Sequence, residues 1–199
     1  NTNMLSLAAA VDPLRAANRQ AQTPLYEWEF ITPEASDVRL TSGLVVPANP
    51  IHRLAGCDVL ILVAGVDPAA QANPRLLASL RRLAQNPITL LAVDGGAWMA
   101  GKAGLLDGHK ATTHWEDLET FAETFPEVTV ENARYVVSGP RWTSGGAAPA
   151  LDMMLHLIAH QHGAPLAAKV AAGFIHTAHP APSDPQLRHL PATRHTRIT

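Results

Sequence analysis

The stretch at residues 90–106, LLAVDGGAWMAGKAGLL, predicts a strand, a tight turn and a helix in immediate succession. Its first four residues are aliphatic, as in a buried strand, and the small residues from Ala97 onward favour a helix. A strand, a tight turn and a helix together make a nucleophile elbow, on which enzymes expose a serine or a cysteine. Here the apex of the turn is Asp94, so the stretch is an active site, a former active site or an ordinary turn.

Segments of the same two kinds alternate along the rest of the chain. We expect strands at residues 26–32, 43–46, 58–64, 88–93, 128–130, 134–138 and 141–143, and helices at residues 4–19, 73–85, 115–124, 147–160 and 165–176, besides the one that follows the turn. The continuous aliphatic run DVLILVA at residues 58–64 is typical of a parallel strand that is buried on both faces. Strands that alternate with helices therefore predict an α/β fold with a doubly wound, mostly parallel sheet flanked by helices.

Two positions carry specific signals for where helices begin and end. Pro13 lies inside the first predicted helix and predicts a kink or an early end, because proline removes a backbone hydrogen bond. Asn73 followed by Pro74 predicts the start of another helix, with Asn73 as its N-cap.

Length and composition limit the class of protein. The 199 residues, 47% of them hydrophobic and 16% charged, are sufficient for one domain with a real core. The formal net charge of −2 gives no sign of a nucleic-acid surface, and the single cysteine fits a reducing compartment. No apolar run has the roughly 18–20 residues of a membrane span, and no signal peptide is visible, so we expect a cytoplasmic protein that does not bind membranes.

The last segment of the chain differs in character from the rest. Residues 179–199, HPAPSDPQLRHLPATRHTRIT, are rich in proline, histidine and arginine and poor in large apolar residues. We expect one domain at residues 1–178 and a linker or tail at residues 179–199.

A ligand site is expected where the carboxyl ends of the parallel strands meet. The residues that we predict to line it follow the strands or begin the helix near residue 147: Gly65, Asp94, Gly95, His114, Trp115, Ser144 and Gly145. Each has an ordinary alternative, because Asp-Gly is a common turn and a lone histidine is more often a surface or core residue. On local sequence alone, the ordinary turn is the favoured interpretation of Asp94.

No metal or cofactor is expected. His156 and His160 have the i, i+4 spacing of a metal pair, but they lack an acidic or thiol partner nearby and fit a helix surface better. Cys57 precedes a buried strand and is interpreted as a packed, inert thiol.

Three blocks, taken together, resemble a known family. They are DVLILVAGVDPAAQANP (58–74), LLAVDGGAWMAGKAGLLDGHKATTHW (90–115) and ENARYVVSGPRWTSGGAAPALDMMLHLI (131–158). In this order they resemble the ThiJ/PfpI branch of the class I glutamine amidotransferase-like superfamily, over nearly the whole chain. The resemblance is strongest to the sensor domains of AraC-family transcriptional regulators, and it implies a flavodoxin-like fold.

The same resemblance shows where the chain departs from an enzyme. It implies a catalytic cysteine at the position of Asp94, a histidine at His114 and, in one catalytic branch, a supporting acid near Ser6. A carboxylate is a poor nucleophile towards amides. We expect backbone N–H groups at the helix N-terminus to stabilise Asp94 as an anion and to leave no free oxyanion donors. We therefore predict that no residue is catalytic.

The function that the resemblance implies is a non-catalytic sensor that binds a small metabolite, in particular a cationic amino compound such as arginine or a betaine. It would act on DNA only through a helix-turn-helix domain that follows residue 199, and it would form a homodimer. One alternative is a hydrolase or hydratase that uses Asp94 and His114, and another is a purely structural dimerisation domain.

The family also begins with a strand ahead of the first helix. This chain begins almost at that helix, so either the strand precedes Asn1 or the sheet is one strand shorter. We expect the former, because an empty position beside buried strands would leave their backbone groups unpaired.

Overall fold

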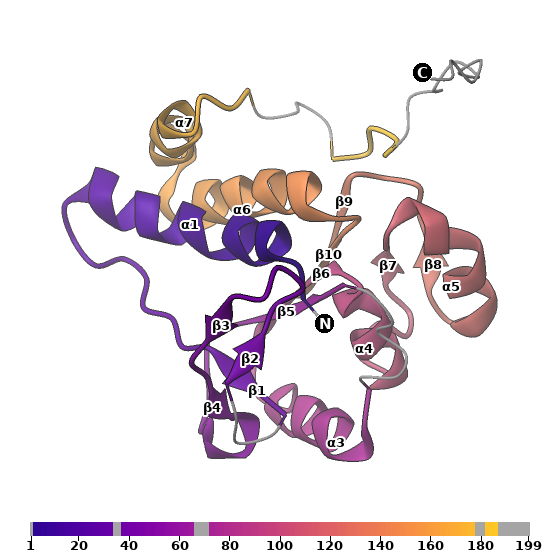
Figure 1. The fold of residues 1–199 in the computed structure, drawn as a ribbon. Helices are drawn as coiled ribbons and strands as arrows, with labels where there is room; N and C mark the ends of the chain where they lie inside the picture. The colour runs from indigo at the N-terminus through magenta and orange to yellow at the C-terminus, as the bar shows by residue number, and fades with distance from the viewer. Residues whose placement is uncertain (1, 34–36, 66–71, 178–181, 187–199) are drawn as a thin grey trace, which may run out of the picture.

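The computed structural model describes residues 2–33, 37–65, 72–177 and 182–186, and its centre is a mainly parallel sheet (Figure 1). In the described residues this sheet has four strands: β5 (Val59–Ala64), β6 (Thr89–Asp94), β10 (Arg141–Ser144) and β9 (Tyr135–Ser138). The order is β5-β6-β10-β9, with parallel pairing except between β10 and β9. The predicted strands at residues 58–64, 88–93, 134–138 and 141–143 are thereby confirmed.

Helices cover both faces of the sheet (Figure 1). One face carries α1 (Met4–Ala21), α6 (Ala147–His162) and α7 (Ala164–Gly173), and the other carries α3 (Pro74–Leu83), α4 (Gly96–Lys102) and α5 (Leu118–Thr124).

Successive side chains of strand β6 point alternately into the two hydrophobic cores, one on each face of the sheet. Leu90 and Ala92 pack in the core on the side of α3 and α4, whereas Leu91 and Val93 pack against α1 and α6. A strand with apolar side chains on both faces needs a cover on each, so the predicted doubly wound α/β fold is confirmed.

The two helix signals have different outcomes. Helix α3 begins as predicted, with the Asn73 side chain accepting a hydrogen bond from the Leu76 N–H at 2.9 Å. The expected early end of the first helix at Pro13 is wrong, because α1, which is 18 residues long, continues through this proline to Ala21. Pro13 is buried, as are Leu14 and Ala17 beside it, so packing offsets the missing backbone hydrogen bond.

The remaining strands are short pairs outside the main sheet. They are β1 (Ile31–Thr32) with β4 (Asn49–Pro50), β2 (Val38–Arg39) with β3 (Val45–Val46), and β7 (Lys110–Ala111) with β8 (Thr129–Val130). Of the strands expected at residues 26–32 and 43–46, only the last two residues of each form a strand, as β1 and β3. Two 3-10 turns, η1 (Ile51–Arg53) and η2 (Trp115–Asp117), complete the described elements.

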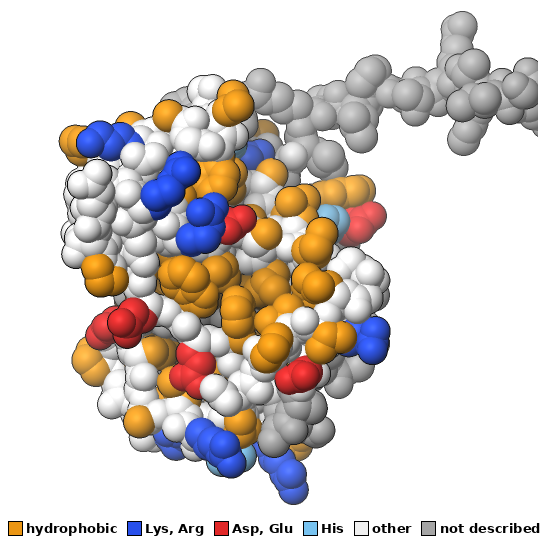
Figure 2. Space-filling model, turned by 60° about the vertical axis from the view of Figure 1, so that its left-hand side comes forward, with side chains coloured by type: hydrophobic (Ala, Val, Ile, Leu, Met, Phe, Trp, Pro, Cys, Tyr) orange, Lys and Arg blue, Asp and Glu red, His pale blue; other side chains and the backbone are white. Residues whose placement is uncertain are grey.

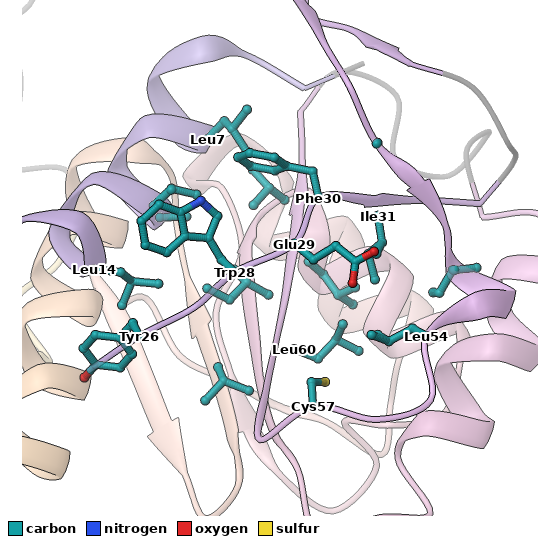
Figure 3. Close-up of a pocket in the computed structure, with 18 of the residues that line it drawn as sticks. Leu7, Leu14, Tyr26, Trp28, Glu29, Phe30, Ile31, Leu54, Cys57 and Leu60 are labelled. Atoms are coloured by element: carbon teal, nitrogen blue, oxygen red, sulfur yellow. The ribbon is translucent and has the colours of Figure 1, made fainter. Parts of the chain in front are cut away.

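A hollow of about 1010 Å³ separates β5 from residues 26–32. Figure 2 shows hydrophobic side chains gathered in it, and Figure 3 shows Trp28 and Phe30 on the segment ahead of β1, with Leu14 and Leu7 of α1 alongside. Within the described chain, β5 pairs with β6 alone, so its other edge faces this hollow. Strand β5 is less buried than expected on one face, since alternate residues, Val59 among them, are only half-buried, although they pack against the core on the side of α1 and α6.

No helix in the described ranges combines the length and the apolar character that crossing a membrane requires. The predicted domain boundary at residues 178 and 179 lies outside the described residues, as does most of the predicted linker.

Candidate functional site

Asp94 ends β6 in the left-handed conformation, with φ of 58°. This conformation is costly for a residue with a side chain and persists where the surrounding structure imposes it. Helix α4 begins two residues later at Gly96, where a Cβ atom would overlap the carbonyl oxygen of Leu62 in β5. The segment therefore has the sharp strand-to-helix form of an elbow, with a carboxylate at its apex.

The Asp94 carboxylate is bound from the start of α1. Its Oδ2 accepts hydrogen bonds from Asn3 Nδ2 at 3.3 Å and from Ser6 Oγ at 3.4 Å. Among the described residues, no backbone N–H of α4 donates to this carboxylate, in contrast to our expectation. At the start of α4, the Trp98 N–H donates to the Gly95 carbonyl at 3.1 Å.

Burial raises the pKa of Asp94 above its ordinary value. The charge of His114 and the hydrogen bonds from Ser6 and Asn3 lower it, while Asp117 raises it further. The expected stabilisation of the anion is therefore wrong in its net direction, because lost hydration outweighs the favourable neighbours. Ionised Asp94 is in a less favourable setting than a carboxylate in water.

His114 lies beside the elbow, immediately before η2. Its Nδ1 is 3.5 Å from Glu116 Oε2, and its ring centroid is 5.7 Å from that of Trp115. The preceding Thr113 donates a long hydrogen bond of 3.5 Å from its hydroxyl to the backbone oxygen of Asp94. The structure thus brings Asp94 and His114 into electrostatic range, whereas Trp115 is 44% exposed and borders the site from outside.

The predicted glycines and Ser144 lie at the same edge of the sheet. Gly65 directly follows β5, whose last carbonyl, that of Ala64, accepts a hydrogen bond from Gly95 N–H at 3.0 Å. Ser144 ends β10 fully buried, and its hydroxyl has no hydrogen-bond partner among the described atoms. Gly145 follows it and donates to the Arg134 carbonyl at 3.0 Å.

The predicted set of site residues lacks three contributors to this edge. Asn3 is the first; its adjacency to Asp94 depends on how α1 packs. The second is the pair Thr112 and Thr113, both fully buried, for which the ATTHW motif was an available signal. The third is Gln186, which lies in the expected linker and had no local signal.

Other reactive groups lie elsewhere. Cys57, the only cysteine of the chain, precedes β5 at the amino end of the sheet, opposite the elbow, and burial raises the pKa of its thiol. The described residues contain no cluster of three side chains suited to a metal ion. His156 packs against the rings of Tyr135 and Trp142, as a residue of a helix surface does. The hollow beside β5 includes neither Asp94 nor His114 in its lining.

A doubly wound α/β domain with an elbow at the carboxyl edge of its sheet is the class that these features define. The model of the DJ-1/PfpI family matches residues 11–160, and the chain belongs to this family.

Several relatives are transcriptional regulators. The chain is 37% identical over 174 residues to the HTH-type transcriptional regulator CdhR of Pseudomonas aeruginosa, covering 87% of this chain and 52% of the relative. It is 35% identical over 188 residues to the HTH-type transcriptional regulator GlxA of Rhizobium meliloti, covering 94% and 58%. The chain therefore spans little more than half the length of these relatives.

Solved structures share the fold. A structure described as an AraC family transcriptional regulator from Pseudomonas putida superposes with a TM-score of 0.79 at 24% identity, covering 87% of this chain and 94% of that one. Another similar protein is an enzyme: the isonitrile hydratase of Pseudomonas putida is 30% identical over 125 residues, covering 60% of this chain and 54% of the enzyme.

Proposed function

We propose that this domain is a non-catalytic sensor that binds a small molecule at the carboxyl edge of the sheet, around Asp94 and His114. The observation that carries the proposal is the elbow itself, which presents a half-buried carboxylate at the strained apex. The only thiol of the chain is at the opposite end of the sheet, so thiol chemistry has no nucleophile at the elbow.

A cationic amino compound is the ligand class that suits this site. Asp94 is the acceptor at the apex, and Asp117 acts on it as a second negative charge. Glu116 lies against His114 and adds a third carboxylate to the same rim. A bound cation would restore the favourable surroundings that Asp94 loses by burial, which supplies free energy for binding.

The regulatory role is inferred from the relatives. Since CdhR and GlxA are HTH-type regulators of which the match covers only 52% and 58%, we infer that the domain controls an attached DNA-binding domain that follows it. In this arrangement the domain contacts DNA only through that partner and acts as a homodimer, the commonest form of soluble homo-oligomer.

Thermal unfolding with and without cationic amines tests the proposal. We expect L-arginine or glycine betaine at millimolar concentration to raise Tm in the wild-type chain and in Asp107→Asn, a control that removes an exposed carboxylate. The shift should disappear in Asp94→Asn. A shift that survives in Asp94→Asn, or no shift with any cationic amine, would contradict the proposal.

A hydratase or hydrolase is the second candidate, favoured by the similarity to isonitrile hydratase. In it, Asp94 and His114 would form an acid–base pair, and the raised pKa of Asp94 would suit a proton donor. Assays on isonitriles, amides and glyoxals distinguish the two functions. Turnover that His114→Ala abolishes would establish the enzyme and displace the sensor.

A further inference from the structure

Residues 182–186, which we call the strap, lie across the beginning of strand β9. The Arg134 N–H donates to the Asp184 carbonyl at 2.9 Å, and the Tyr135 N–H donates to the Pro182 carbonyl at 3.4 Å. Both of these hydrogen bonds are between backbone groups. The strap thus follows the free side of the last strand and ends beside the elbow.

The strap places the side chain of Gln186 in a cluster of oxygen atoms. Gln186 Nε2 donates to the Thr113 carbonyl at 2.7 Å, to the Ala133 carbonyl at 3.0 Å and to Thr112 Oγ1 at 3.0 Å. Two of these partners are backbone carbonyls, which only accept, so the nitrogen end of the carboxamide must face them. We call these three oxygens the acceptor cluster.

The surroundings of the acceptor cluster form a built site. Thr112 and Thr113 are fully buried, and the neighbouring Ser144 is fully buried with a hydroxyl that has no partner among the described residues. Gly145 makes the room, because the nearest atoms to a Cβ at this position all belong to the end of the Gln186 side chain. The backbone of Gly145 is not in the left-handed region, so its conformation does not require glycine. Glycine is needed here because a side chain would occupy the space of the Gln186 carboxamide.

The acceptor cluster is directly linked to Asp94. Thr113 contributes its carbonyl to the cluster and its hydroxyl to the Asp94 backbone oxygen. A ligand at the elbow and the carboxamide of Gln186 would therefore both lie beside Thr112 and Thr113. The one hydroxyl among the three oxygens, that of Thr112, donates to the Ala133 carbonyl at 3.1 Å and so keeps its lone pairs for an incoming donor. The cluster therefore selects a nitrogen that carries hydrogens: an ammonium, a guanidinium or a primary amide.

We propose that the acceptor cluster is a binding subsite for an N–H-donating group of the ligand, and that Gln186 fills it in the unliganded domain. A ligand that places its nitrogen there displaces the carboxamide and, with it, releases the strap from β9. The inference rests on the proposed sensor function and adds to it both a ligand chemistry and a route for the signal. Binding at the elbow would thereby detach residues 182–186 from β9.

Amide hydrogen exchange at Arg134 and Tyr135 measures the strap directly in the 199-residue chain. We expect Gln186→Ala and Gly145→Ala each to speed exchange at both amides about tenfold, the loss expected when one buried hydrogen bond no longer supports the strap. Gln85→Ala and Gly56→Ala are matched controls at exposed positions and should leave both amides unchanged.

Ligand displacement is then measured with L-arginine and methylammonium, which donate N–H groups, and with glycine betaine, which has none. The N–H donors should speed exchange at Arg134 and Tyr135 in the wild-type chain and bind several-fold more tightly to Gln186→Ala, whereas betaine should do neither. Unchanged exchange and unchanged affinity in Gln186→Ala would overturn the inference, even if Asp94→Asn abolishes binding and so supports the sensor. Binding that depends on Gln186 but survives Asp94→Asn would support the subsite and contradict the sensor function proposed for Asp94.

Discussion

Asp94 combines two unfavourable features at a single residue. Its backbone is in the left-handed region, and burial raises the pKa of its carboxyl. Asn3 and Ser6 donate to the carboxylate only through long hydrogen bonds of 3.3 and 3.4 Å, so they recover part of the lost hydration. A residue that costs stability in the folded domain and lies at the carboxyl edge of the sheet is typical of a functional position.

The substitution Asp94→Asn should stabilise the domain at neutral pH. Asparagine tolerates the left-handed conformation and carries no charge, so the cost of burying an anion disappears. We expect Tm to rise by about 2–4 °C, the shift that ~1 kcal/mol produces in a chain of this size. Differential scanning calorimetry of the two chains provides the measurement.

The pH dependence of that difference has a definite sign. Because the pKa of Asp94 is raised in the folded state, the destabilisation is fully present above this raised pKa. It disappears as the pH falls through that pKa towards the ordinary value of the unfolded chain, so the Tm values of the two chains should converge in acid. A difference that widens on acidification would show that Asp94 is stabilising as an anion.

The elbow depends on how closely two elements approach. Strand β5 and helix α4 meet at Gly96, where the Leu62 carbonyl occupies the space of a Cβ atom. This contact fixes the direction of α4 and hence the position of Asp94 at the edge of the sheet. The glycine is required by packing between elements, not by its backbone angles, which are not in the left-handed region.

Gly96→Ala should therefore destabilise the domain by about 1–3 kcal/mol, the usual cost of forcing a methyl group into a packed core. Gly56→Ala is the matched control, since nothing lies within 4 Å of a Cβ there. Urea unfolding should give a lower midpoint for Gly96→Ala and an unchanged one for Gly56→Ala. Equal midpoints would mean that β5 and α4 move apart without cost.

At the scale of the whole molecule, one edge of the sheet, that of β5, has no strand paired with it among the described residues. The free edge of β5 faces residues 26–32 across the apolar hollow in Figure 3, and Trp28 remains 42% exposed there. Thr2 lies at the carboxyl end of β5, where its hydroxyl donates to the Val63 carbonyl at 3.0 Å. A parallel strand that leads into Thr2 would run along this edge and cover the hollow.

Extending the chain ahead of Asn1 with an apolar strand should stabilise the domain. A copy of the β5 sequence VLILVA offers both backbone pairing and apolar side chains, and we expect a rise in Tm of at least about 5 °C. The same extension with proline at alternate positions is the control, because proline cannot donate to a strand ladder. If both extensions gave equal Tm values, the hollow would not be a strand position.

Local patterns were sufficient for much of the fold. The aliphatic run before Asp94 predicted β6, and Asn73 with Pro74 predicted the start of α3, because each signal depends on neighbours along the chain. The elbow and His114 were identified in the same way, through residues close in sequence and their resemblance to a family. The first helix was predicted, but its expected early end at Pro13 was wrong, because packing from other elements, not local propensity, holds α1 together there.

The sequence by itself therefore determined the alternation of strands and helices, the family and the position of the carboxylate at the elbow. Only the tertiary structure decided the burial and the hydrogen-bond partners of that carboxylate, since one of its donors, Asn3, is 91 positions away in the chain. Likewise, only the tertiary structure showed the hydrogen bond from the Gln186 side chain to the Thr113 carbonyl, which joins residues 73 positions apart. Hydration lost on burial and hydrogen bonds between distant segments depend on the packed shape, which no local pattern contains.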